Sequence, residues 1–113
     1  MERKKQLILY VLKLLETNSD ENHPITQTMI SKTISEVYPC DRKTVGRNIK
    51  FLKEMGYPIV KTSKGFYLKN KAFSVDEIVF VKEAILTSDK MNIEERKELA
   101  NQVVECISKK YSK

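Results

Sequence analysis

The chain has 113 residues, of which 41% are hydrophobic and 32% are charged, and its formal net charge is +6 at pH 7. This length and composition suit one domain with a buried core, or one small domain with a short helical addition. No run of about 18 apolar residues is present and no small-residue cleavage site follows the basic N-terminus, so we expect neither a membrane-spanning helix nor a signal peptide.

The first predicted helix covers Glu2 to Thr17. Its apolar residues recur at the spacing of one helix face. They are Leu7, Ile8, Val11, Leu14 and Leu15. Residues 18–24 are rich in turn formers, so we expect an exposed, mobile connection there and not a functional site.

A second helix is predicted from a cap at Thr26 to Tyr38, because Pro39 disfavours helical conformation in the residue before it. Its buried side is expected to consist of Met29, Ile30, Ile34 and Val37. Only Pro39 and Cys40 then remain before Asp41. Two helices joined by so short a turn cross at a large angle, as in a helix-turn-helix.

The third predicted helix begins at an Asp41 cap and runs to Met55, where Gly56 ends it in a left-handed conformation. One stripe of this helix is apolar and consists of Val45, Ile49 and Leu52. The opposite face is basic and carries Lys43, Arg47 and Lys50, with Gly46 at its edge as a point of close approach. The helix is therefore amphipathic, with a one-sided positive charge.

A small β-hairpin is predicted next, with strands over 59–62 and 66–68 and a turn over 63–65 that uses Gly65. Residues 41–70 contain eight basic and two acidic residues, so they account for the net charge of the entire chain. Positive charge concentrated on one helix and one hairpin is typical of a phosphate-binding surface.

Charge is balanced after residue 70, with eight basic and eight acidic residues. Two capping boxes, Ser74 with Glu77 and Asn92 with Glu95, predict helices over 75–88 and 93–108. The apolar residues of the first of these helices cover more than one stripe, so it needs partners on two sides. We interpret residues 71–113 as a neutral packing or dimerisation segment that follows a first unit over 1–70.

Few residues in the sequence suggest a catalytic or metal site. His23 is the only histidine and has no cysteine or paired carboxylates at ligand spacing, so we expect no metal, no cofactor and no catalytic histidine. Cys40 and Cys106 lie far apart without C-x-x-C spacing, which favours a reducing cytoplasm. Cys106 has apolar neighbours and is expected in the core.

Duplex DNA is the predicted ligand. In a helix-turn-helix the second helix enters the major groove with its N-terminal residues at base edges, and a following hairpin tip can reach phosphates or the minor groove. Arginine suits bidentate guanine readout, while lysine more often supplies a charge to phosphate. The candidate DNA-binding residues are Arg42, Lys43, Thr44, Arg47, Asn48, Lys50, Lys61, Ser63 and Lys64.

The run D-R-K-T-V-G-R-N-I-x-x-L-x-x-x-G-x-P-I over 41–59 resembles winged-helix regulators of the DeoR-like type. It is more closely similar to the N-terminal part of WYL-domain transcriptional regulators, with Asn48 in place of their usual Asp. The segment 64–68 resembles the end of their wing, and 73–78 resembles the linker helix that follows it.

This resemblance implies a mainly α winged helix-turn-helix with a β-hairpin wing and a C-terminal helical pair. It also implies sequence-specific DNA binding in transcription regulation, which we expect from a homodimer on two half-sites. The WYL ligand-sensing domain would follow this region, so a fragment of a longer regulator and a stand-alone protein both stay open.

The alternatives to DNA as a ligand are protein and RNA. A protein-interaction module is the alternative, because winged-helix folds can bind proteins and the apolar helices of 74–108 could bind a partner chain. RNA binding is disfavoured, since single-strand readers display stacking aromatics. Core packing is the simpler expectation for the four aromatic residues of the region, namely Phe51, Tyr57, Phe66 and Tyr67.

Overall fold

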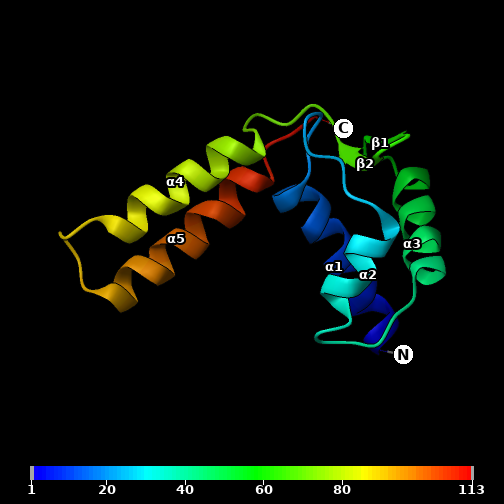
Figure 1. The fold of residues 1–113 in the computed structure, drawn as a ribbon, viewed down its shortest axis with the longest axis horizontal. Coiled ribbons are helices and arrows are strands. Elements are labelled where there is room, and N and C mark those ends of the chain that lie inside the picture. The colour runs from blue at the N-terminus through cyan, green and yellow to red at the C-terminus, as the bar shows by residue number, and fades with distance from the viewer. Residues whose placement is uncertain (1, 113) are drawn as a thin grey trace.

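The computed structural model describes residues 2–112, and the side chains of residues 6–112. The described chain is mainly helical with one antiparallel hairpin, which confirms the expected fold class at this level (Figure 1). The elements are α1 (Glu2–Asn18), α2 (Gln27–Ile34), α3 (Arg42–Glu54), β1 (Ile59–Thr62), β2 (Gly65–Leu68), α4 (Val75–Thr87) and α5 (Ile93–Ser108). None of the described helices has the length and hydropathy needed to cross a membrane.

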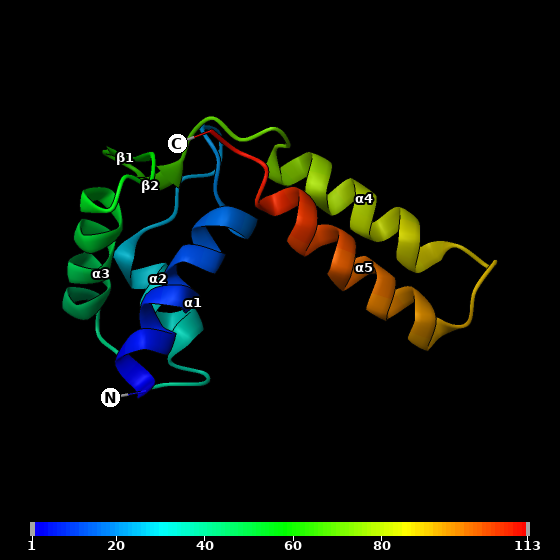
Figure 2. The same cartoon turned by 180° about the vertical axis from the view of Figure 1, so that it is seen from behind.

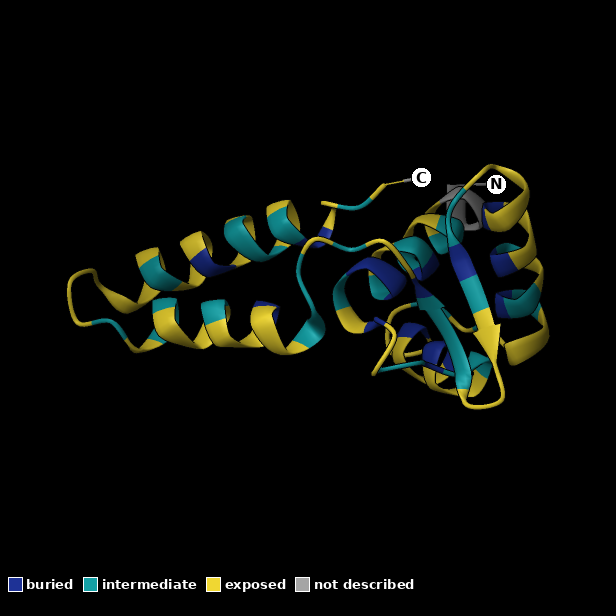
Figure 3. Ribbon diagram, turned by 90° about the horizontal axis from the view of Figure 1, so that it is seen from above, coloured by how far each residue is buried: buried dark blue, intermediate teal, exposed yellow. Residues whose placement is uncertain are grey.

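The hydrophobic core lies between α1, α2, α3 and the hairpin. Its buried residues are Val11, Leu15, Ile25, Ile30, Ile34, Val45, Ile49, Leu52, Ile59 and Leu68. The predicted apolar stripe of α3 is therefore confirmed, and the dark blue bands in Figure 3 mark its inward face. Each such aliphatic side chain stabilises the fold by about 1.5–3 kcal/mol when fully buried.

The second helix is shorter than predicted. It ends at Ile34 and not at Tyr38, so residues 35–41 connect it to α3. The Ser35 hydroxyl donates to the Cys40 carbonyl oxygen at 3.0 Å and closes this connection. The predicted burial of Met29 and Val37 is wrong, since they are 52% and 60% exposed. Val37 lies beyond the helix, where helical spacing no longer applies. The predicted burial of Ile30 and Ile34 is confirmed.

The hairpin is fastened to the segment before α2. Thr62 pairs with Gly65, so Ser63 and Lys64 form its two-residue tip. Ile25 forms a single antiparallel β-bridge with Phe66: its N–H donates to the Phe66 carbonyl at 2.8 Å, and the Phe66 N–H donates to the Ile25 carbonyl at 2.7 Å. The hairpin consequently cannot swing independently of the helices.

The expectation of an exposed, mobile connection over 18–24 is wrong, because Ser19 and Asp20 are buried. The Ser19 hydroxyl donates to the Leu15 carbonyl at 2.5 Å and accepts from the Leu68 N–H at 3.1 Å. One Asp20 carboxylate oxygen accepts from the Val75 N–H at 2.6 Å. The segment therefore joins α1, β2 and the first turn of α4.

The other Asp20 carboxylate oxygen accepts from the Asn22 N–H and lies 2.8 Å from Nδ1 of His23. Burial raises the pKa of Asp20, but the hydrogen bonds from Val75, His23 and Asn22 outweigh it and hold the pKa below its usual value of 3.8. The Asp20 bond raises the pKa of His23, and the nearby Asp76 carboxylate adds to this effect.

Helices α4 and α5 pack chiefly against each other and project away from α3 and the hairpin (Figures 1 and 2). Both predicted capping boxes are present. Only Ile78 and Ala100 are buried among their apolar residues. The prediction that Cys106 lies in the core is wrong: it is exposed, because the two helices cover only one side of each other.

The residues after α5 return to the base of α4. The Ala72 N–H donates to the Lys110 carbonyl at 2.7 Å, and the Tyr111 hydroxyl donates to the buried Glu16 carboxylate at 2.6 Å. Lys71 donates from Nζ to the Glu16 carbonyl oxygen. Burial lowers the pKa of Lys71 and raises that of Tyr111. These contacts hold the start of α4 and the end of α5 against α1.

Replacing Asp20 with asparagine should destabilise the fold in a pH-dependent way. Because the folded pKa of Asp20 is lowered, its carboxylate contributes stability above pH 3.8, and this contribution is lost as the pH falls through the folded pKa. Asp20→Asn should therefore lower the free energy of unfolding by about 1–3 kcal/mol at neutral pH, and by less in acid. Urea denaturation at neutral and at acidic pH measures this loss of unfolding free energy. Glu21→Gln, which changes the exposed neighbour, is the control. An equal loss of unfolding free energy at both pH values would contradict a stabilising role for the Asp20 charge.

Candidate functional site

The start of α3 is fixed by its cap, as predicted. The Thr44 N–H donates to a carboxylate oxygen of Asp41 at 2.8 Å, and the Val45 N–H donates to the Asp41 carbonyl at 3.2 Å. The bond from Thr44 holds the pKa of Asp41 below its usual value. This carboxylate satisfies backbone donors that would otherwise lack partners in the first turn.

Gln27 sets the position of α3 against α2. Its side-chain amide donates from Nε2 to the Arg42 carbonyl at 2.8 Å. A Cβ added to Gly46 would lie 2.5 Å from the same Nε2, which confirms the close approach predicted at this glycine. The sequence did not identify Gln27, because its partners lie on the next helix. The glycine inside a helix was the only local signal of the contact.

The outward face of α3 is basic. Arg42, Lys43, Arg47 and Lys50 are exposed, and Lys53 joins them. Thr44 and Asn48, also predicted to contact DNA, are half-buried. Arg47 donates to the Thr44 hydroxyl at 3.1 Å, and the Asn48 side chain donates to the Thr44 carbonyl at 3.0 Å. The amide of Asn48 is thus engaged by its own helix.

The hairpin presents the three other predicted residues to solvent: Lys61 on β1, and Ser63 and Lys64 at its tip. Thr62 shapes the tip, since its hydroxyl donates to the Gly65 carbonyl at 3.0 Å and accepts from the Lys64 N–H at 3.1 Å. The hairpin and α3 lie on one side of α1, and the α4–α5 pair lies on the other (Figures 1 and 2). The exposed cations of α3 and the hairpin therefore share one end of the molecule.

No ion pair joins an acidic side chain to these cations in the described part of the chain, although the Asp41 carboxylate interacts electrostatically with Arg47 and Lys43. The ion pairs found there are Lys109 with Glu105, and His23 with Asp20 and Asp76. None of them involves a basic residue of 41–70. The positive charge of this region is consequently available to an external anion.

One aromatic side chain of α3 departs from expectation. Phe51 was expected in the core, yet it is exposed, as is Met55 one helical turn later. Both follow Arg47 at steps of four residues, so they continue its side of α3. Tyr57, Phe66 and Tyr67 are half-buried, and Tyr57 and Phe66 pack against the core.

Within the described residues, no three His, Cys, Asp or Glu side chains gather where they could hold a metal ion. Comparisons of the chain with protein-family models, with curated proteins and with solved structures found no match.

Replacing Gly65 should loosen the hairpin more than replacing Gly56. Gly65 has φ +137°, and a Cβ there would lie 2.6 Å from the Ile25 carbonyl oxygen. Gly56 has φ +101° but open space around it. We expect Gly65→Ala to cost about 2–3 kcal/mol of unfolding free energy and Gly56→Ala about 1 kcal/mol. Urea denaturation compares the two, and equal losses would contradict the tight Ile25–Phe66 junction.

Proposed function

We propose that this chain is a winged helix-turn-helix unit that binds duplex DNA in a sequence-specific manner and regulates transcription. The observation that carries the proposal is the exposed basic surface made by α3 and the hairpin, whose cations form no ion pair in the described part of the chain. A surface of this kind attracts the phosphate backbone and releases its counterions on binding.

The arrangement of elements supports the winged-helix assignment. Three helices enclose one core, α3 follows α2, and a hairpin follows α3. The Ile25–Phe66 bridge joins the segment between α1 and α2 to the hairpin. The connection over 35–41 is longer than the usual 3–4 residues of a helix-turn-helix turn. The proposal therefore rests on the faces and the hairpin, and not on a tight turn.

DNA recognition would divide between α3 and the hairpin. The N-terminal half of α3 would enter the major groove, where Arg42, Lys43 and Arg47 reach base edges or flanking phosphates. Lys61 and Lys64 would contact phosphates beside the groove. Asn48 would need to leave its bond to the Thr44 carbonyl before reading a base, so we assign it a smaller part than Arg47.

The alternative is a protein-interaction surface, and one observation favours it. Phe51 and Met55 expose apolar surface on α3 next to the cations, and exposed aromatic and methionine side chains are enriched in protein interfaces. The cations outnumber these two residues on the same helix face, so DNA is the better-supported ligand.

Arg47→Ala tests the DNA proposal. Arg47 is exposed and bonds only to Thr44, so its loss should leave the free energy of unfolding almost unchanged. We expect duplex affinity to fall by about 5- to 150-fold, the equivalent of 1–3 kcal/mol for a base contact. Fluorescence anisotropy with a labelled duplex measures it, and Lys97→Ala, an exposed cation on α5, is the matched control.

The outcomes separate the two readings. Loss of affinity in Arg47→Ala but not in Lys97→Ala supports DNA binding through α3. Equal affinity in the wild type and both variants would remove Arg47 from the interface. The alternative would be favoured if the wild type and Arg47→Ala bound duplex DNA equally at low salt, and if Phe51→Ala lost a protein partner that the wild type binds.

A further inference from the structure

The chain exposes more surface than a compact monomer of its size. Its accessible surface is 7809 Å², whereas a monomer of 13.2 kDa exposes roughly 6,400 Å². Its radius of gyration is 14.9 Å, compared with about 13.3 Å for a compact domain of this length. The excess of roughly 1,400 Å² exceeds the about 800 Å² that each partner contributes to a standard protein interface.

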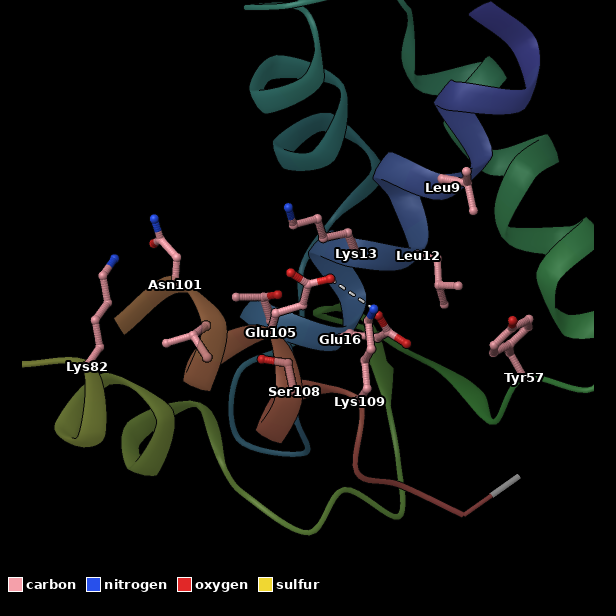
Figure 4. Close-up of a pocket in the computed structure, with 12 residues that line it drawn as sticks. Leu9, Leu12, Lys13, Glu16, Tyr57, Lys82, Asn101, Glu105, Ser108 and Lys109 are labelled. Atoms are coloured by element: carbon pink, nitrogen blue, oxygen red, sulfur yellow. Dashed lines mark hydrogen bonds and ion pairs between the residues drawn. The ribbon is translucent and has the colours of Figure 1, made fainter. Parts of the chain in front are cut away.

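A cleft of about 790 Å³ lies between α1 and the α4–α5 pair (Figure 4). One wall is α1, where Leu9 is 63% exposed and Leu12 is half-buried. The other wall comes from α4 and α5 and includes Lys82 and Val104. The cleft therefore has two facing walls, each with apolar surface.

The α4–α5 pair exposes apolar residues on more than one side. Val79 and Phe80 are consecutive and so point about 100° apart on α4. Val79 lies on the same side of the helix as Lys82 of the cleft, whereas Phe80 faces elsewhere and is 72% exposed. Met91, Ile93 and Leu99 add exposed apolar surface toward the distal end. A helix pair of this kind is covered best by a partner that contacts it from two sides.

Charges in the cleft and on the distal end of the pair are of opposite sign. The cleft lining carries three cations, Lys13, Lys82 and Lys109, and two carboxylates, Glu16 and Glu105, so its formal charge is +1. Glu105 pairs with Lys109 at 3.1 Å. The distal segment 89–98 carries four carboxylates and three cations. One of these cations, Arg96, is occupied by the Leu86 carbonyl at 2.7 Å. The distal end is thus mildly acidic.

We propose that two copies of this chain form a symmetric dimer in which the α4–α5 pair of each copy lies in the cleft of the other. Each chain then supplies both the cleft and its occupant, as a two-fold interface requires. The two walls of the cleft cover the two apolar sides of the inserted helices. This dimer does not depend on DNA binding, since α3 and the hairpin lie on the other side of α1.

Sedimentation equilibrium over a concentration series tests the dimer. We expect the wild type to reach twice the monomer mass of 13.2 kDa. Leu9→Lys changes the α1 wall and Phe80→Glu changes the inserted helix, and each should raise the dimer dissociation constant at least tenfold. Both residues are exposed, so far-ultraviolet circular dichroism should show intact folding. Val37→Lys, an equally exposed apolar position outside the cleft, should dimerise like the wild type.

Photocrosslinking locates the occupant of the cleft. The starting protein carries Cys40→Ser and Cys106→Ser, and a benzophenone is attached at Leu9→Cys. Mixing ¹⁵N-labelled and unlabelled copies identifies crosslinks between chains by mass spectrometry. We expect a covalent dimer in which position 9 of one copy is joined to residues 75–108 of the other.

Three results would overturn the proposal. The first is a monomer at every concentration, which would leave the cleft to another occupant. The second is a dimer whose dissociation constant does not change in Leu9→Lys. The third is a dimer whose crosslinks from position 9 join only other parts of the second copy.

Discussion

The buried polar segment after α1 is the constraint on which the rest of the structure depends. Ser19 satisfies the Leu68 N–H of the hairpin, Asp20 satisfies the Val75 N–H at the start of α4, and Ile25 pairs with Phe66. Backbone donors buried without partners would each cost about 1–3 kcal/mol. This short segment therefore fixes the positions at which the hairpin and the α4–α5 pair leave the core.

This anchoring gives the two ends of the molecule different properties. At one end, the hairpin and α3 are held firmly enough to present a fixed pattern of cations, which a sequence-specific reader needs. At the other end, the α4–α5 pair is tied at its base by the return of residues 110–112 but has little cover along its length. We propose that the first end binds DNA and the second end binds another copy of the chain.

Local chemistry made much of the fold and the candidate site predictable. The caps at Asp41, Ser74 and Asn92, the buried stripe of α3 and the conformations of Gly56 and Gly65 follow from neighbouring residues alone. Features that depend on distant contacts were not predicted. In the sequence alone, Ser19 and Asp20 look like ordinary loop residues, because their backbone partners are distant in the chain. Gln27 likewise contacts a distant residue, the Arg42 carbonyl at the start of α3. Cys106 and Phe51 show that an apolar neighbourhood in sequence does not ensure a covering partner.

The most direct test of DNA recognition is selection from a pool of randomised duplexes, followed by affinity measurements over a range of salt concentrations. The account predicts an enriched inverted repeat with half-sites about one helical turn apart, and an affinity that falls steeply as salt rises. Binding without any enriched sequence would contradict specific recognition. No binding even at low salt would contradict the proposed role of α3 and the hairpin altogether.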